Sequence, residues 1–401
     1  MAIADVKEYT HLTAEQVEEL GRELDAVRER IEASRGAADA AYINRMITIQ
    51  RRLAAAGRVT LFASRWKPAF FAGAAMLGVA KILENMEIGH NVMHGQWDWM
   101  NDPEIHSSSW EWDTAQPAEQ WKHSHNYVHH QFTNVLGHDN DIGYGILRMA
   151  REQRWHPAHV GQPVYNTLLA LLFQWGVALH DLDLEAIRTG RKDPKEMKRQ
   201  LRQIGRKVRR QISKDYIVYP LLSGPSALST MKANAVANVM RNLWSYTIIF
   251  CGHFPDGAMH FTEKELEDET RAEWYLRQML GSANFEGGPL LHIMSGNLGY
   301  QIEHHLYPDL PSNRYAEISV EVKELCDRYA IPYTIGPLHK QYGQALRTII
   351  KLSLPNGMTT DTVPFPGPTP PPKRVRRRRL VDSERPVRRT ETGTWSTRRS
   401  A

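Results

Sequence analysis

Cysteine is scarce in this sequence. The 401 residues include only Cys251 and Cys326, which lie far apart and form no Cys-x-x-Cys motif. Their scarcity excludes a disulfide framework and disfavours a structural zinc site, which usually includes cysteine. The His-Glu-x-x-His signature of zinc proteases is also missing. The N-terminal residues contain no apolar run of the kind that a signal peptide needs, so we expect none.

Long hydrophobic runs are also few. The mean hydropathy is −0.49, which is low for a protein that crosses a membrane many times. The apolar segment 59–83 is interrupted at residues 64–68 and has no clean run of about 20 apolar residues, the length that spans a bilayer. A second apolar segment, 216–254, is broken at Gly224 and Pro225. We read the second segment as a helical hairpin, and the first as either a short re-entrant hairpin or one span.

Positive charge is concentrated in two places. Residues 188–214 contain twelve Lys or Arg against two acidic residues, which predicts a cytoplasmic position. The apolar segment 163–179 before them should therefore lie in the membrane interface or re-enter rather than cross. Residues 373–401 contain eleven basic and three acidic residues, a net charge of +8 that leaves −3 of the total +5 for the rest. We predict a disordered tail that attracts anionic lipid, and no nucleic-acid binding by the folded part.

The N-terminal region is polar but patterned. Thr13 and Gln16 form a capping box for a helix over residues 13–33. Apolar residues recur along it with 4-3-4 spacing, which predicts an amphipathic helix packed on its own protein or on a membrane surface. We divide the chain into this helix (1–40), a central domain (41–350) and the Pro- and Arg-rich tail (355–401).

Histidine, by contrast, is placed where it can bind metal. Three motifs in chain order are His-x-x-x-His, His-x-x-x-His-His and Gln-x-x-His-His. A single such pair is usually a surface or core feature, but three in one chain favour a joint metal site. Seven imidazoles are too many for one ion, and a Glu-x-x-His motif occurs beside only one of them, at Glu87. Two irons ringed by nitrogen fit this pattern better than the carboxylate-rich ferritin-like site. The seven are His90, His94, His125, His129, His130, His304 and His305.

Together with their flanking residues, the three motifs resemble the membrane fatty acid desaturases. The segments 84–94, 133–134 and 304–315 resemble in particular the actinobacterial acyl-CoA Δ9 desaturases, and the likeness extends over about residues 40–345. The resemblance implies an all-α fold in which membrane-embedded helical hairpins carry a cytoplasmic helical cap with a histidine-box di-iron site. It also implies a membrane enzyme with its catalytic face in the cytoplasm.

The resemblance further implies a ligand set and a reaction. By position, His253 matches the histidine at the end of the last span that completes the iron shell in this family. The cofactors are two non-haem irons, with O₂ as co-substrate and electrons from NAD(P)H through a separate ferredoxin- or flavin-reductase-type protein. The substrate is a long-chain acyl-CoA or acyl lipid, most simply stearoyl- or palmitoyl-CoA, desaturated at Δ9. Glu87, Asp141 and Glu303 are candidates to orient the ligands.

Three alternatives remain open at this stage. Gln301 replaces the first histidine of the third motif, as in front-end (Δ5/Δ6-type) desaturases, and is a possible weak ligand. The cytochrome-fusion motif His-Pro-Gly-Gly of those enzymes is absent. A lipid hydroxylase would use the same three motifs. A metal transporter is disfavoured, because its histidines would lie inside long spans. His106, His123 and His138 break the family spacing and are not expected to bind metal.

Overall fold

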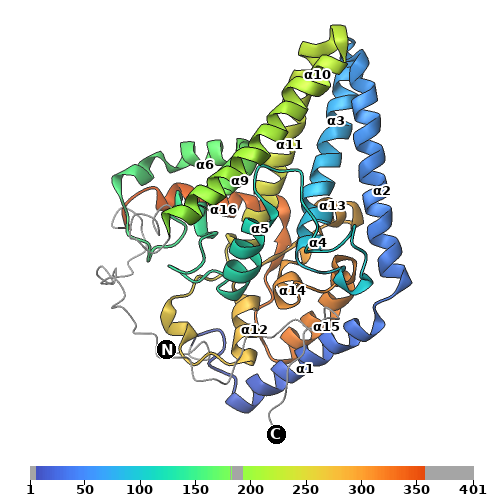
Figure 1. Ribbon diagram of the computed structural model, residues 1–401. Helices are drawn as coiled ribbons and strands as arrows, with labels where there is room; N and C mark the ends of the chain where they lie inside the picture. The colour runs from blue at the N-terminus through green and yellow to red at the C-terminus, as the bar shows by residue number, and fades with distance from the viewer. Residues whose placement is uncertain (1–5, 181, 183–192, 357–401) are drawn as a thin grey trace.

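Two helical hairpins rise from a broader helical base (Figure 1). The computed structural model describes residues 6–180, 182 and 193–356, and the predicted tail from residue 357 on lies outside them. In the first hairpin, α2 (Ala37–Thr60) turns into α3 (Lys67–Leu83). The two helices approach closely because Gly57 faces Leu77 and Gly73 faces Leu61, where a Cβ atom would not fit. The interruption at residues 64–68 is therefore the turn of a hairpin.

The second hairpin is built from a long helical path and its return. The path runs through α9 (Pro194–Ile212), a π-helical turn and α10 (Tyr219–Leu222), and it ends at Gly224 and Pro225 as expected. The returning helix, α11 (Ala227–His253), packs along α3. The predicted interfacial segment forms α6 (Gln162–Leu171) and α7 (Phe173–His180), which leave Val164, Leu168 and Leu179 exposed.

The N-terminal helix α1 (Ala14–Ser34) lies along the base and packs on the protein itself. The predicted capping box at Thr13 is present. Leu20, Leu24 and Ile31 share one buried core with residues from α12 (Arg271–Leu280), α14 (Gln301–Leu306) and α15 (Tyr315–Arg328). Polar contacts reinforce this packing, since Arg28 Nη1 bonds Asp309 at 2.8 Å and the Tyr307 hydroxyl donates to the Leu24 carbonyl at 2.9 Å.

The fold is mostly helical, whereas an all-α fold was predicted. Two three-residue strands, β1 (Asn284–Glu286) and β2 (Ile335–Pro337), pair in parallel. Sequence periodicity cannot indicate strands this short. The remaining helices are α4 (Asn91–Met93), α5 (Ala118–Trp121), α13 (Pro289–Met294) and α16 (Leu338–Leu352).

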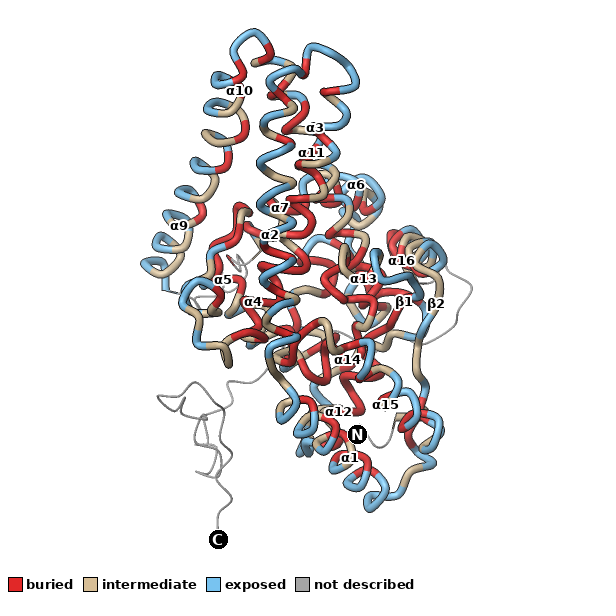
Figure 2. The backbone as a smooth tube through the Cα atoms, turned by 90° about the vertical axis from the view of Figure 1, so that its right-hand side faces the viewer, coloured by how far each residue is buried: buried red, intermediate tan, exposed pale blue. Residues whose placement is uncertain are grey.

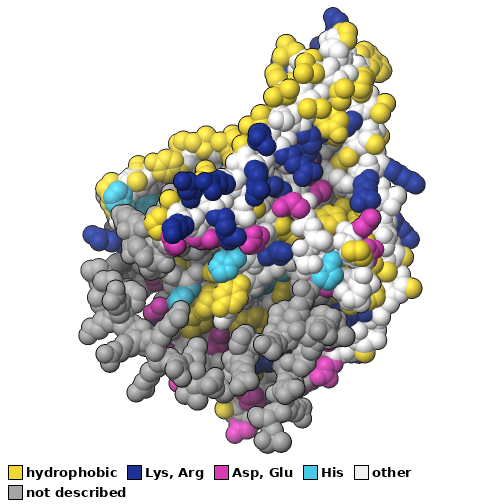
Figure 3. Space-filling view, in the orientation of Figure 1, with side chains coloured by type: hydrophobic (Ala, Val, Ile, Leu, Met, Phe, Trp, Pro, Cys, Tyr) yellow, Lys and Arg dark blue, Asp and Glu magenta, His cyan; other side chains and the backbone are white. Residues whose placement is uncertain are grey.

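Exposure differs between the two parts of the molecule. The free end of the hairpins carries exposed apolar side chains, whereas the base is densely buried where the helices meet (Figures 2 and 3). Basic side chains line α9 below this apolar end (Figure 3). Among the described residues, one helical stretch, Lys67–Met93, is long and apolar enough to cross a membrane, and more than half of its most apolar window is buried in the protein. The exposed apolar residues at the free end are Val59, Phe62, Trp66, Phe71, Leu221 and Leu222.

Candidate metal centre

The first histidine motif continues directly from α3. Residues 84–90 form a π-helical turn, and α4 follows, so His90 and His94 lie one turn apart with ring centroids 4.6 Å from each other. A π-helical turn widens the helix locally and often marks a functional site. Gly89 permits this turn, because a Cβ there would lie 2.7 Å from the Glu84 carbonyl oxygen.

The second motif also lies on a π-helical turn, residues 122–129, which extends α5. His125 and His129 stack with centroids 4.9 Å apart. His130 points to a different side, so that its ring is 4.7 Å from that of His94 and 4.4 Å from that of His305. The helical spacing predicted that the first two share a face and that the third diverges, and the structure confirms it.

Distant segments complete the centre. The third motif lies on α14, where His304 and His305 are both fully buried. The last residue of α11, His253, has its ring 4.8 Å from His129 and 4.9 Å from His305. The structure thus brings all eight predicted histidines together, from four helical segments.

Their nitrogen atoms fall into two groups. Within each group, the possible ligand atoms lie within 4.8 Å of one another. His130 belongs to neither group and lies between them, against both His304 and His305. The first group, the four-histidine cluster, comprises His90, His94, His125 and His304; the second, the three-histidine cluster, comprises His129, His253 and His305.

The donor atoms are suited to hold metal. A buried nitrogen lone pair with nothing to bond is costly, so several such atoms facing one point indicate an absent ligand. Here the Nε2 atoms of six of the eight histidines are buried and have no hydrogen-bond partner among the described residues. They belong to His94, His125, His129, His130, His304 and His305.

The protein holds the Nδ1 atoms of several of the eight rings. His90 Nδ1 bonds the Asn91 side-chain oxygen at 2.9 Å, and His304 Nδ1 lies 3.2 Å from the Tyr315 hydroxyl. His305 Nδ1 lies 3.1 Å from Gln278 Oε1. Such contacts fix the tautomer and leave Nε2 free to face the centre. Sequence reasoning missed all three partners. Gln278 and Tyr315 are separated from their histidines by 27 and 11 residues, and Asn91, although next to His90, belongs to no motif that would single it out.

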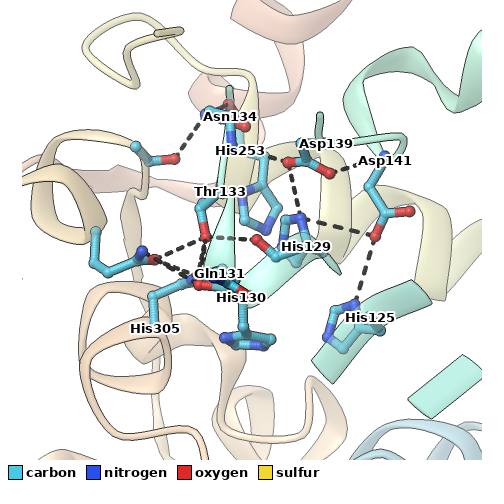
Figure 4. Close-up of polar contacts among 12 residues, drawn as sticks. His125, His129, His130, Gln131, Thr133, Asn134, Asp139, Asp141, His253 and His305 are labelled. Atoms are coloured by element: carbon cyan, nitrogen blue, oxygen red, sulfur yellow. Dashed lines mark hydrogen bonds and ion pairs between the residues drawn. The ribbon is translucent and has the colours of Figure 1, made fainter. Parts of the chain in front are cut away.

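Two carboxylates contact the second motif (Figure 4). Asp139 Oδ2 accepts from His129 Nδ1 at 2.9 Å, and Asp141 Oδ2 lies 3.5 Å from His125 Nδ1. Burial lowers the pKa of His129, but Asp139 and Asp141 outweigh it, so that the pKa is raised above its ordinary 6.5. Burial dominates at His125, whose pKa is lowered. Asp141 was predicted as an orienting residue and contacts a candidate ligand, His125, whereas Asp139 was missed.

The other two predicted orienting carboxylates were assigned wrongly. Glu87 accepts hydrogen bonds from Tyr42, Asn297 and Ser312, and no histidine among the described residues bonds its carboxylate. Glu303 accepts from Asn284 and Tyr333. The helix turns both carboxylates away from the neighbouring histidines. Their hydrogen bonds instead join the first and third histidine motifs to surrounding segments.

Gln301 and the three histidines outside the motifs lie in different surroundings. The Gln301 amide Nε2 lies 3.0 Å from His253 Nε2, so this side chain touches the three-histidine cluster. His106 pairs with Asp98, and His138 pairs with Glu263 at 2.8 Å, both away from the clusters. His123 stacks on Tyr127 at the surface. These positions lie apart from both clusters, and the exclusion of these three histidines from the metal site stays a prediction.

A cavity opens beside the two clusters. It measures about 970 Å³ including the solvent at its mouth, and His90, His125, His129 and His253 form part of its wall. The buried Arg241 also faces it, held by the Asn242 side chain at 3.2 Å. Most of its exposed wall area is apolar, which suits an alkyl chain. Its apolar wall includes Met86, Trp112, Phe173, Val177, Ile249 and Leu298.

Comparison with known proteins agrees with this geometry. The fatty acid desaturase family model matches residues 64–337. The chain is 56% identical, over 90% of its length and 86% of the relative's, to the NADPH-dependent stearoyl-CoA 9-desaturase of Mycobacterium tuberculosis. It is 25% identical, over 70% of its length and 79% of the relative's, to the sn-1 linoleoyl-lipid 6-desaturase of Synechocystis. The chain belongs to the fatty acid desaturase family.

Proposed function

We propose that this enzyme introduces a double bond at position 9 of stearoyl-CoA, or of the shorter palmitoyl-CoA. The convergence of seven histidines from distant segments beside an apolar-walled cavity carries the proposal. The name of the mycobacterial relative, at 56% identity over 90% of the chain, supports the acyl-CoA substrate and the position. The front-end alternative has weaker support, from the relative at 25% identity that desaturates position 6.

The resident metals in this proposal are two irons, one in each cluster. Imidazole donors suit iron, and the absence of cysteine from the site disfavours structural zinc. Bound iron supplies the activation of O₂ that unactivated C–H bonds require. We assign all eight histidines to its ligand shell. His130 lies between the clusters and is the one placed to serve either metal.

The protein's own residues orient the histidines, position the substrate and exclude water. Side chains around the centre orient the imidazoles that they contact, and the cavity wall places one pair of methylene carbons beside the histidines that line it. The apolar side chains keep water from the reacting carbons. Overall, each turnover removes two hydrogens from adjacent carbons and reduces O₂ to two waters. Two of the four electrons come from the substrate and two from NADPH through a separate redox protein.

We also propose that the hairpins enter the cell membrane while the base stays in the cytoplasm. The exposed apolar side chains at the free end match lipid, and Arg209 and Arg210 on α9 lie just before the apolar part of that helical path. Basic residues at this boundary favour the cytoplasmic side and anionic lipid. The exposed apolar face of α6 would then lie in the interface.

The test of the reaction is fatty-acid analysis of a host that expresses the chain with an NADPH-dependent electron donor. A new Δ9 bond in C18 or C16 chains, located by mass spectrometry, is expected. His304→Ala should abolish the product, whereas the matched variant His138→Ala, outside both clusters, should retain it. A bond near the carboxyl end or a hydroxylated product would replace the proposal with a front-end desaturase or a hydroxylase.

The membrane arrangement can be tested by cysteine labelling, because the native cysteines, Cys251 and Cys326, are buried. A single new cysteine at the exposed Ala63, on the hairpin end, or at the exposed Val320, on the base, provides a site for a membrane-impermeant maleimide. In inverted vesicles the base variant should react and the hairpin-end variant should not. Reaction of both variants at equal rates would refute insertion.

A further inference from the structure

The two clusters differ in the charge of the side chains that contact their outer ring nitrogens. In the four-histidine cluster, the outer nitrogens of His90 and His304 contact the neutral side chains of Asn91 and Tyr315. In the three-histidine cluster, His129 donates to the carboxylate of Asp139 at 2.9 Å. The nearest carboxylate in the four-histidine cluster is Asp141, 3.5 Å from His125. The closest carboxylate contact therefore falls on the cluster with fewer histidines.

The carboxylate of Asp139 is held in place by backbone donors (Figure 4). Its Oδ2 accepts from the Asn134 N–H and its Oδ1 from the Asp141 N–H, both at 2.9 Å. The loop that allows this bends through Asn134 and Gly137, which have positive φ angles of 56° and 86°. A carboxylate with both oxygens fixed in this way cannot turn away from His129.

Asp139 also differs from the other buried acids in its partners. Its side chain is 1% exposed, and among the described residues its one ion-pair partner is the His129 ring. A buried carboxylate without a Lys or Arg partner is costly, and positive charge nearby lowers that cost. A metal ion bonded to His129 Nε2 would supply that charge through the ring, and the carboxylate would in turn strengthen the ring as a ligand.

We propose that Asp139 is a positioning residue that makes the two metal positions unequal. It fixes His129 with Nδ1–H toward the carboxylate and Nε2 toward the metal, and it strengthens metal binding selectively at the three-histidine cluster. This inference rests on the proposed function. In this inference Asp139 acts on the metal through the charge that it places on the His129 ring, not through a bond to the metal.

The experiment is an anaerobic titration of the metal-free full-length protein with Fe(II), with iron bound per chain as the readout. The wild type should bind two irons. Asp139→Asn should bind the first with unchanged affinity and the second about 10- to 100-fold more weakly. The matched control is Asp98→Asn, which removes a carboxylate from His106, a histidine outside the centre. It should bind both irons like the wild type.

A second comparison separates an effect through His129 from an effect on the loop. His129→Ala and the double variant His129→Ala/Asp139→Asn should bind iron alike, because the carboxylate acts only through that ring. Unchanged affinity in Asp139→Asn would overturn the inference, as would equal weakening of both irons or a further loss in the double variant. A wild type that binds no iron would instead overturn the proposed function. Mössbauer spectra of ⁵⁷Fe-loaded protein should show one of two iron signals altered in Asp139→Asn.

Discussion

Arg277 connects the end of the second histidine motif to α12, and its loss should destabilise the base of the molecule. Its side chain is 1% exposed and bonds both carboxylate oxygens of Glu269, at 2.6 and 2.9 Å. The same guanidinium donates to the backbone carbonyls of Gln131, at 2.9 Å, and Thr133, at 3.4 Å. Arg277→Met removes all four contacts and leaves a mostly buried carboxylate unpaired.

The expected loss in free energy of unfolding follows from these four contacts. Breaking a buried ion pair by removing one partner costs about 3–5 kcal/mol, largely because the other charge stays buried. Adding Glu269→Gln removes that stranded charge, so the double variant should recover part of the loss, with a coupling energy of about 0.5–3 kcal/mol. Denaturant unfolding in detergent micelles, followed by circular dichroism, measures both quantities.

The control is Lys323→Met, which breaks the exposed pair with Asp327 on α15. Exposed pairs contribute little, so this variant should unfold close to the wild type. The reasoning would be refuted if Arg277→Met lost less than about 1 kcal/mol, or if the double variant were no more stable than the sum of the two single losses predicts.

Three further outcomes are expected. Burial raises the pKa of Glu303 to about 7 from 4.5, so the folded state holds a proton that the unfolded state releases, and stability falls as pH rises through this window. Relative to the wild type, the free energy of unfolding of Glu303→Gln should therefore rise by about 2–3 kcal/mol from pH 5 to pH 8, measured by denaturant unfolding. A difference between the two proteins that stays constant with pH would contradict this assignment. A Cβ on Gly299 would overlap the His292 ring, so Gly299→Ala should cost about 1–3 kcal/mol; Gly288→Ala, with open space around it, should leave the thermal midpoint unchanged. Arg28→Met breaks the contact of α1 with Asp309 and should lower the thermal midpoint, whereas an unchanged midpoint would mean that α1 docks through its apolar residues alone.

The histidine motifs could be predicted because their chemistry is local. His125 and His129 are four residues apart, so any helical path gives them a common face, even the π-helical one that occurs here. The hairpin turns were equally local, since Gly224 and Pro225 interrupt an apolar run. In both cases the sequence neighbours carry the information.

The contacts around the centre could not be predicted in this way. Asp139 reaches His129 only because the loop bends at Asn134 and Gly137, and Tyr315 reaches His304 from the start of α15. Glu87 and Glu303 look from sequence like candidates equal to Asp141, yet the rotation of each helix turns their carboxylates away from the histidines. Orientation within a shared core is set by packing between distant segments, which a single sequence does not reveal.

The seating of α1 on the base has a consequence for biosynthesis. Arg28 and its partner Asp309 are separated by 281 residues. At a synthesis rate of about 5–20 residues per second, α1 leaves the ribosome about 15–55 s before its binding partner exists. During that interval its apolar stripe has no site on the protein. The first helix made is therefore among the last to dock, and the nascent chain needs a membrane surface or a chaperone to shield it until the third histidine motif has been synthesised.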